Sequence, residues 1–248
     1  FLRAMHAARP DLTGRIDGVG VHPYSPTPAG VVALVAGTRA TLDALGQGDT
    51  PIAVTELGWP RPNASPTASF ALPDDTRAGS FALVSDALAA SDCGIDRLVL
   101  FTWTTAMSDP AEQEDWFGLA GPDGSPTPAA EALAQAARRP PPPGPLPICH
   151  PGSAAPAPPL RLGLEVRAAP SAEVPGETCV VATATYRDLP VRGLEVRFQR
   201  PGSEHHARLT DDRGEATRCV PPGPAVRVWA SAGGGAWASS TLRAVATP

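Results

Sequence analysis

The sequence predicts an α/β region over residues 1–138 and an all-β sandwich over residues 161–248, joined by a proline-rich linker at 139–160. Two observations carry this prediction. In the first region short apolar runs alternate with amphipathic stretches, which is typical of βαβ units with a parallel sheet covered on both faces. In the second region short alternating strands follow one another without helices between them, which is typical of a β-sandwich.

The first region contains three predicted strands, each followed by a predicted helix. The strands are expected at 16–22, 52–56 and 95–103, and the helices at 31–45, 74–90 and 129–137. In the second of these helices, Phe81, Val84 and Leu88 recur at helical spacing, which indicates one apolar face.

The linker is dominated by Pro, Ala and Gly, a composition that favours an extended, semi-rigid spacer. Beyond it, strands are expected at 162–166, 179–185, 194–198 and 225–229. Turn residues at 212–214 separate two of them. We expect this second region to fold independently of the first.

The composition excludes several classes of function. The formal net charge is -5, and acidic and basic residues are interspersed, so the basic patch typical of nucleic-acid binding is absent from the sequence. No apolar run approaches the ~20 residues needed to cross a membrane. The chain opens on Phe1 without an initiator Met, and we expect it to be the interior of a longer protein.

Four cysteines permit two disulfides. Cys179 and Cys219 lie in predicted strands of the second region and are placed to pair across it. Cys93 precedes the third strand and Cys149 follows the last helix, so a βα fold brings both to the same face. The sequence does not fix this connectivity, and small buried thiols are the alternative. The even count favours an oxidising, extracellular setting. No set of residues has metal-ligand spacing, so no metal site is predicted.

Polar and aromatic side chains follow the three strands of the first region. His22 ends the first and Tyr24 lies two residues beyond it, Glu56 ends the second, and Trp103 ends the third. In parallel βα folds the reactive residues gather at the carboxyl ends of strands. A carboxylate that stays ionised there needs hydrogen-bond donors nearby, which His and Tyr supply.

Three motifs in this order carry a resemblance to a known family. The stretches HPY at 22–24, TELGW at 55–59 and FTW at 101–103 resemble strands six, seven and eight of the (β/α)8 glycoside hydrolases of clan A, near the cellulase family 5 and xylosidase family 39 types. The segment WFGL at 116–119, followed by PDGSPTPAA at 122–130, is similar to the one that closes many such barrels. The resemblance implies that residues 1–138 are the C-terminal part of a TIM barrel.

Roles follow from this resemblance, residue by residue. It implies that Glu56 is the catalytic nucleophile, that Tyr24 hydrogen-bonds to it, and that His22 contacts a sugar hydroxyl. Trp103 would form an apolar platform under the sugar. No cofactor is implied. For each residue a structural role is the alternative: an ion pair for the glutamate, a hydrogen-bonded histidine, or core packing for the tryptophan.

Three further residues lie in loops on the presumed substrate face. Trp59 and Trp116 are candidate walls of the sugar site, with loop packing as the alternative. Asp109 is a candidate for recognition of a sugar hydroxyl, with loop capping as the alternative.

The sequence departs from the family at the second carboxylate. Retaining glycosidases use two carboxyl groups about 5 to 5.5 Å apart, one as nucleophile and one as acid/base. No Asn-Glu pair occurs in the sequence, and Glu112 and Glu114 match no acid/base motif. We therefore expect the acid/base in a missing N-terminal barrel half upstream. The prediction is a fragment of a secreted retaining glycoside hydrolase that is inactive alone. The alternative is a non-catalytic carbohydrate-binding or cell-surface protein.

The second region resembles bacterial immunoglobulin-like repeats of the invasin type, on the stretches at 190–198 and 210–216. Such a domain would act as a spacer or accessory module beside the first region.

Overall fold

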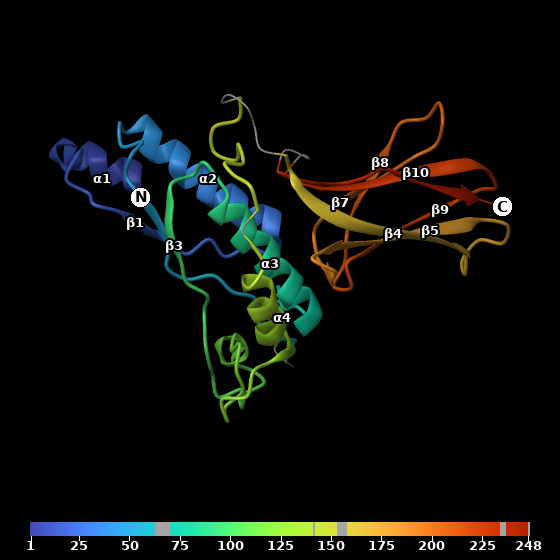
Figure 1. Ribbon diagram of the computed structural model, residues 1–248, viewed down its shortest axis with the longest axis horizontal. Helices are drawn as coiled ribbons and strands as arrows, with labels where there is room; N and C mark the ends of the chain where they lie inside the picture. Colours follow the sequence, from blue (N-terminus) through green and yellow to red (C-terminus); the bar gives the residue numbers. More distant parts are fainter. Residues whose placement is uncertain (63–69, 141, 153–157, 234–236, 248) are drawn as a thin grey trace.

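The computed structural model describes residues 1–62, 70–140, 142–152, 158–233 and 237–247, and it contains two β-sheets (Figure 1). The smaller sheet has the strand order β1-β2-β3. The larger one has nine strands. Helices α3 and α4 lie between the two sheets in Figure 1.

The smaller sheet consists of β1 (Val19–Val21), β2 (Ile52–Val54) and β3 (Ile95–Leu98). All neighbours are parallel, and Val21 pairs with Val54 at the carboxyl end of the first two strands. Ile52 and Val54 of the central strand are fully buried, whereas the two outer strands are partly exposed. This sheet therefore positions the residues that follow β1 and β2 at one edge.

Four α-helices and two 3-10 turns accompany this sheet. They are α1 (Leu2–Ala8), η1 (Pro10–Leu12), α2 (Pro28–Ala44), α3 (Asp74–Ala89), η2 (Gln113–Trp116) and α4 (Pro128–Ala137). Thr27 caps α2, because its Oγ1 accepts a hydrogen bond from the Gly30 amide at 3.2 Å. In the described part of the chain, no helix combines the length and apolar character needed to cross a bilayer.

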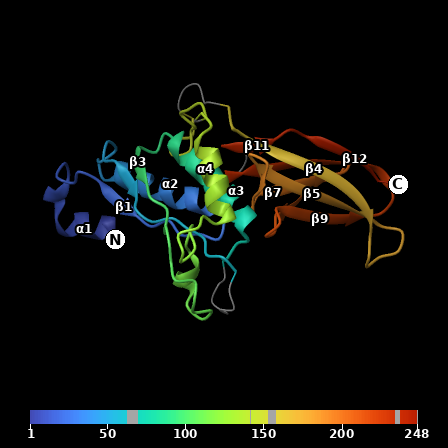
Figure 2. The ribbon, with the colours of Figure 1, turned by 60° about the horizontal axis from the view of Figure 1, so that its bottom comes forward.

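The larger sheet is formed by the C-terminal strands. They are β4 (Leu160–Pro170), β5 (Thr178–Tyr186), β6 (Leu189–Pro190), β7 (Glu195–Gln199), β8 (His206–Leu209), β9 (Glu215–Val220), β10 (Gly223–Ala232), β11 (Ala238–Ser240) and β12 (Arg243–Thr247). The main path runs β6-β5-β4-β11-β10-β7-β8, with β9 paired to β5 and β12 paired to β10. Figure 2 shows β4 between β11 and β5.

The predicted fold class, a partial TIM barrel with an immunoglobulin-like sandwich, is wrong. The described chain is mostly β, and its nine C-terminal strands form one curled, mixed sheet. The prediction fails at β4 and β11, because these two strands pair in parallel. Their pairing joins strands that an immunoglobulin fold keeps in two separate antiparallel sheets. Within its described residues the first region contributes three strands of three or four residues, too few to enclose a barrel.

The two predicted regions share one hydrophobic core. Helix α3 packs on β5 and β6, and the Asp86 carboxylate on α3 accepts hydrogen bonds from Tyr186 Oη at 2.7 Å and Arg187 Nε at 2.8 Å. Gly79 allows this close approach, because a Cβ there would lie 2.2 Å from the Pro190 carbonyl oxygen. The N-terminal and C-terminal regions are therefore in extensive contact.

Part of the predicted linker is anchored. Leu146 is fully buried, and its amide donates to the Ala90 carbonyl at 2.6 Å just after α3. The Asp92 amide donates back to the Leu146 carbonyl at 3.1 Å. The linker residues 144–150 thus lie against the end of α3 and do not extend freely into solvent.

Candidate active site

The carboxyl ends of β1 and β2 bring three sequence-predicted residues together. Because these strands run parallel with Val21 opposite Val54, the chain after each strand leaves the same edge. The Thr55 amide donates to the Val21 carbonyl at 3.1 Å and continues the pairing by one residue. His22 and Tyr24 therefore face Glu56 across adjacent strand ends.

The contacts converge on one oxygen of Glu56. Tyr24 Oη donates a hydrogen bond to Glu56 Oε2 at 3.0 Å, and His22 Nδ1 lies 3.5 Å from the same oxygen. The Glu56 side chain is 35% exposed and that of His22 is 51% exposed. The carboxylate is thus shielded from water in part, yet still open to a ligand.

Burial raises the pKa of Tyr24 well above its ordinary value, and the hydrogen bond to Glu56 and the charges of Glu56 and Glu114 add to the rise. A phenolate beside a carboxylate would place two negative charges together. Tyr24 therefore stays protonated and remains a hydrogen-bond donor at neutral pH.

Glu56 and Tyr24 line a cavity of about 310 Å³. Its aromatic wall consists of Phe70, Phe101 and Phe117. Phe117 makes edge contacts with the rings of Tyr24 and Phe101, with centroids 5.9 and 5.4 Å apart. The cavity thus combines a carboxylate with apolar ring surface, a combination suited to a ligand with both hydroxyl groups and an apolar face.

Two further polar side chains, Gln113 and Glu114, line the same cavity. Both belong to η2, and the Glu114 residue is exposed. The sequence predicts no site role for Gln113, Glu114 or the three phenylalanines, although Phe101 and Phe117 stand in motifs that carry the family resemblance. The available signal was the spacing of Phe101 and Phe117 around the third strand and its loop, but only the fold shows that these rings converge.

A buried arginine holds the loops around the cavity. Arg77 on α3 is fully buried and donates to the carbonyls of Trp59 and Phe117, both at 2.9 Å, and to Asp74 Oδ1, also at 2.9 Å. Gly58 allows the loop after β2 to approach the backbone at Phe101 closely, because a Cβ there would lie 2.3 Å from the Phe101 carbonyl oxygen. The loop after β2 and the loop carrying Phe117 are therefore fixed against each other.

The structure places Trp59 away from the cavity. Its side chain is fully buried, its Nε1 donates to the Ser25 carbonyl at 2.8 Å, and its ring packs edge-on against Phe81 at 5.2 Å. This is the packing alternative weighed for Trp59. In this structure its ring supports the loop after β2 and does not line the cavity.

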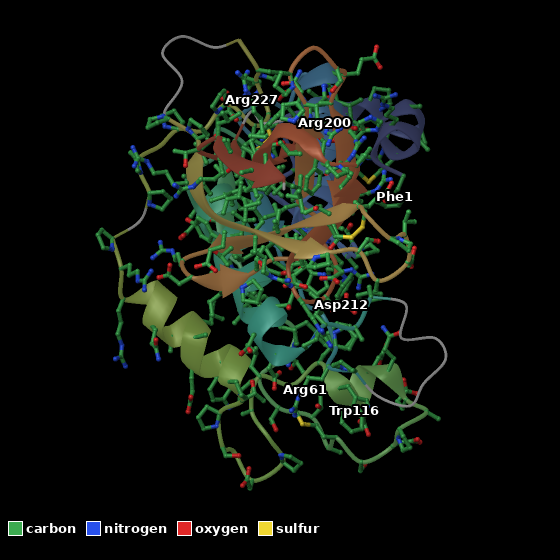
Figure 3. The ribbon with its side chains drawn as sticks, turned by 90° about the vertical axis from the view of Figure 1, so that its right-hand side faces the viewer. Phe1, Arg61, Trp116, Arg200, Asp212 and Arg227 are labelled. Carbon is green, nitrogen blue, oxygen red and sulfur yellow. A yellow bond between two sulfur atoms is a disulfide. The ribbon has the colours of Figure 1, made fainter. Side chains whose placement is uncertain are left out.

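Trp103, Trp116 and Asp109 also lie outside the lining of this cavity. Trp103 is 63% exposed. Trp116 Nε1 donates to the Asp109 carbonyl at 2.9 Å, and the Asp109 amide donates to Asp115 Oδ2 at 3.2 Å, so these residues stabilise the loop that carries η2. Figure 3 shows Trp116 beside Arg61 at one end of the molecule.

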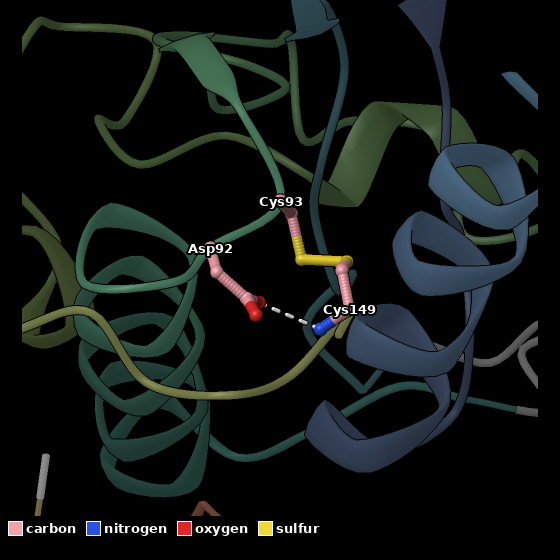
Figure 4. Close-up of side chains that lie close together, drawn as sticks. All are labelled: Asp92, Cys93 and Cys149. Carbon is pink, nitrogen blue, oxygen red and sulfur yellow. Dashed lines mark hydrogen bonds between the residues drawn. A yellow bond between two sulfur atoms is a disulfide. The ribbon is translucent and has the colours of Figure 1, made fainter. Parts of the chain in front are cut away.

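Both expected disulfides are formed, Cys93 with Cys149 and Cys179 with Cys219. Figure 4 shows Asp92 beside the first of them. Asp92 Oδ1 accepts the amide of Cys149 at 2.7 Å, which fastens the loop at the bridge. The sulfurs are not thiolates, the form in which cysteine binds metals, so this cluster is a structural anchor. Two disulfides indicate an oxidising, extracellular environment.

The chain matches no known protein-family model, and a search of curated proteins likewise finds no match.

Proposed function

We propose that the chain carries the nucleophile's part of a retaining glycoside hydrolase site, with Glu56 as the nucleophile. The observation that carries this proposal is the convergence of Tyr24 and His22 on Glu56 Oε2 at the rim of an aromatic cavity. Hydrogen-bond donors aimed at a carboxylate favour its ionised form, which is the form that attacks.

The attack uses the second oxygen of the carboxylate. Within the described residues, Glu56 Oε1 accepts no hydrogen bond, so its lone pair is available to the ligand. Oε1 forms a bond to the anomeric carbon while the bond from that carbon to the leaving-group oxygen breaks and the oxygen takes the electron pair. The product is a glycosyl ester of Glu56, as in other retaining enzymes.

The aromatic wall supports a sugar as the substrate. Sugar rings present apolar C–H faces between their hydroxyl groups, and Phe70, Phe101 and Phe117 offer apolar surface close to the carboxylate. Pockets that bind small ligands usually combine apolar lining with a few placed polar groups.

We place the proton donor outside this chain. A general acid needs a carboxyl group whose pKa is raised by an apolar environment, as in enzymes that pair two carboxylates. Glu114 lines the cavity but is exposed, so it does not have the apolar surroundings that such an acid requires. The chain alone should therefore react only with substrates whose leaving group needs no proton.

The two disulfides support a protein that works outside the cell. We accordingly propose that the hydrolase is secreted or displayed at the cell surface, with the C-terminal strands as an accessory part.

Dinitrophenyl glycosides, fluorinated at the carbon next to the anomeric centre, test this proposal. Their leaving group departs without protonation, and the fluorine slows release of the glycosyl ester. A panel of such sugars is incubated with the full chain, and the intact mass is measured. We expect one sugar to add one glycosyl unit, and E56Q to prevent the addition.

The same panel distinguishes the alternative, a non-catalytic carbohydrate-binding protein. Oligosaccharide binding that is equal in wild type and E56Q, without a mass increase in either, would favour the binding protein and reject the nucleophile.

A further inference from the structure

Arg218 lies on an inward-facing position of β9 in the larger sheet, and Arg200 directly follows β7. On β7, Val196 and Phe198 are buried, and Arg200 directly follows Gln199, the last residue of this strand. On β9, Arg218 stands between the buried residues Ala216 and Val220 in the same alternation. Inward positions normally hold apolar side chains, so an arginine at this position of β9, with a second arginine nearby, requires a physical reason.

The two side chains come together at the end of β9. Arg200 Nη2 donates to the carbonyl of Pro221, the residue that directly follows this strand. Neither arginine lines the Glu56 cavity, and Figure 3 shows Arg200 at the opposite end of the view from Arg61 and Trp116.

Neither guanidinium has its hydrogen bonds complete. Arg200 Nε and Arg218 Nη1 are shielded from solvent, and neither has a hydrogen-bond partner within the described residues. Buried N–H groups of charged side chains are costly to leave unpaired, and in native proteins an ion or an ordered water usually accounts for them.

The charges point to an anion. Burial lowers the pKa of Arg218, and the positive charge of Arg200 lowers it further, so the two groups repel each other. Within the described residues, neither forms an ion pair with a carboxylate that would relieve this repulsion. A bound water would satisfy the N–H groups but would leave the two positive charges facing each other.

We propose that Arg200 and Arg218 form a binding site for a compact oxyanion, either the carboxylate of an acidic sugar or a sulfate group. A guanidinium donates two parallel hydrogen bonds to such a group, and one anion offsets the repulsion between the two arginines. This site does not depend on the function proposed for Glu56.

Thermal unfolding of the full chain tests the site with sodium glucuronate and sodium sulfate against sodium chloride at matched ionic strength. If the anion binds only the folded protein, we expect the unfolding midpoint to rise by about 5 to 10 °C at an anion concentration of 100 times Kd. A rise with glucuronate alone assigns the carboxylate of an acidic sugar, and a rise with sulfate alone assigns a sulfate group.

Variants separate the site from general salt effects, because sulfate also strengthens apolar burial without binding. R218M should lose the anion-dependent rise. R227M is the matched control, because Arg227 is exposed between the buried residues Val226 and Val228 of β10 and points away from the core. It should keep the rise.

R200M serves as a second test of the same site if R218M does not fold. The proposal is overturned if neither anion acts beyond chloride, or if the arginine variant shows the same rise as wild type.

Discussion

Tyr24 donates a 3.0 Å hydrogen bond to Glu56 Oε2 from the end of the neighbouring parallel strand. The two residues are 32 positions apart in the chain. They meet because β1 and β2 end at one edge of the smaller sheet, and this contact organises the candidate site.

Replacing Tyr24 by Phe should slow the glycosylation of Glu56 about tenfold. The variant removes one hydrogen bond to a charged oxygen, and ~1.4 kcal/mol of lost stabilisation corresponds to a factor of ten. The rate is measured from the mass increase with the activated glycoside. Y186F is the matched control, since Tyr186 hydrogen-bonds to Asp86 and should leave the rate unchanged. A rate in Y24F equal to that of Y186F would show that the contact has no chemical role.

Both tyrosines of the chain should resist ionisation in the folded protein. Burial is the largest cause of the raised pKa of Tyr24 and of Tyr186, and the neighbouring carboxylates of Glu56 and Asp86 add to it. An alkaline titration followed by phenolate absorbance should show little ionisation at pH ~10, where half of the tyrosines of an unfolded chain are ionised.

The same shifts set the alkaline stability of the protein. A raised pKa in the folded state means that the folded protein holds these protons more tightly than the unfolded chain does. The contribution of the two tyrosines to the free energy of unfolding is therefore complete below about pH 10, and it is lost as the pH rises through the pKa of the folded state. The free energy of unfolding should therefore fall above pH ~10. Normal titration of either tyrosine in the folded chain would contradict the burial described here.

Replacing Glu114 by Gln should leave glycosylation by a phenyl glycoside, whose leaving group needs a proton, within about twofold of the slow wild-type rate. A general acid would contribute about a hundredfold or more to that reaction, and Glu114 is too exposed for the role. E112Q, a change in the neighbouring exposed loop, is the matched control. A hundredfold loss in E114Q alone would assign Glu114 to the reaction and place both carboxylates in this chain.

The contact between α3 and the larger sheet should make the chain unfold as one unit. D86A removes the acceptor for Tyr186 Oη and Arg187 Nε, at 2.7 and 2.8 Å, and should lower the free energy of unfolding by about 2 kcal/mol.

D96A is the control for this variant. Asp96 forms an ion pair with Arg97 in which both side chains are about half exposed or more, at 48% and 66%, and should change stability by less than ~1 kcal/mol. Urea unfolding measures both variants. Two separate transitions in the wild-type chain would instead support independent folding of the C-terminal region.

The individual helices and strands of this chain are largely predictable from the spacing of its apolar residues. The expected strand at 52–56 and helix at 74–90 correspond to β2 and α3, because apolar runs and helical spacing depend on nearby residues. The third strand was expected to reach Trp103 but ends at Leu98, since apolar composition continues beyond the pairing with β2.

The arrangement of those elements was not predictable in the same way. The parallel pairing of β4 with β11 joins Leu160 to Ala238, and no local pattern encodes a contact between residues so far apart in the chain. That pairing turns the expected sandwich into a single curled sheet.

The candidate site was predictable for those reactive side chains that stand at the ends of strands. His22, Tyr24 and Glu56 are brought together because parallel strands share an edge. The position of Trp59 could not be predicted in this way, since a tryptophan that follows a strand can equally well line a substrate site or pack in the core. Its burial depends on Phe81 of α3.

The location of the covalent label tests whether Glu56 is the nucleophile. The full chain is treated with the activated fluorinated glycoside, digested, and mapped by peptide fragmentation. We expect a single glycosyl group on the side chain of Glu56, and none in E56Q. A label on another residue, or an equal label in E56Q, would contradict it.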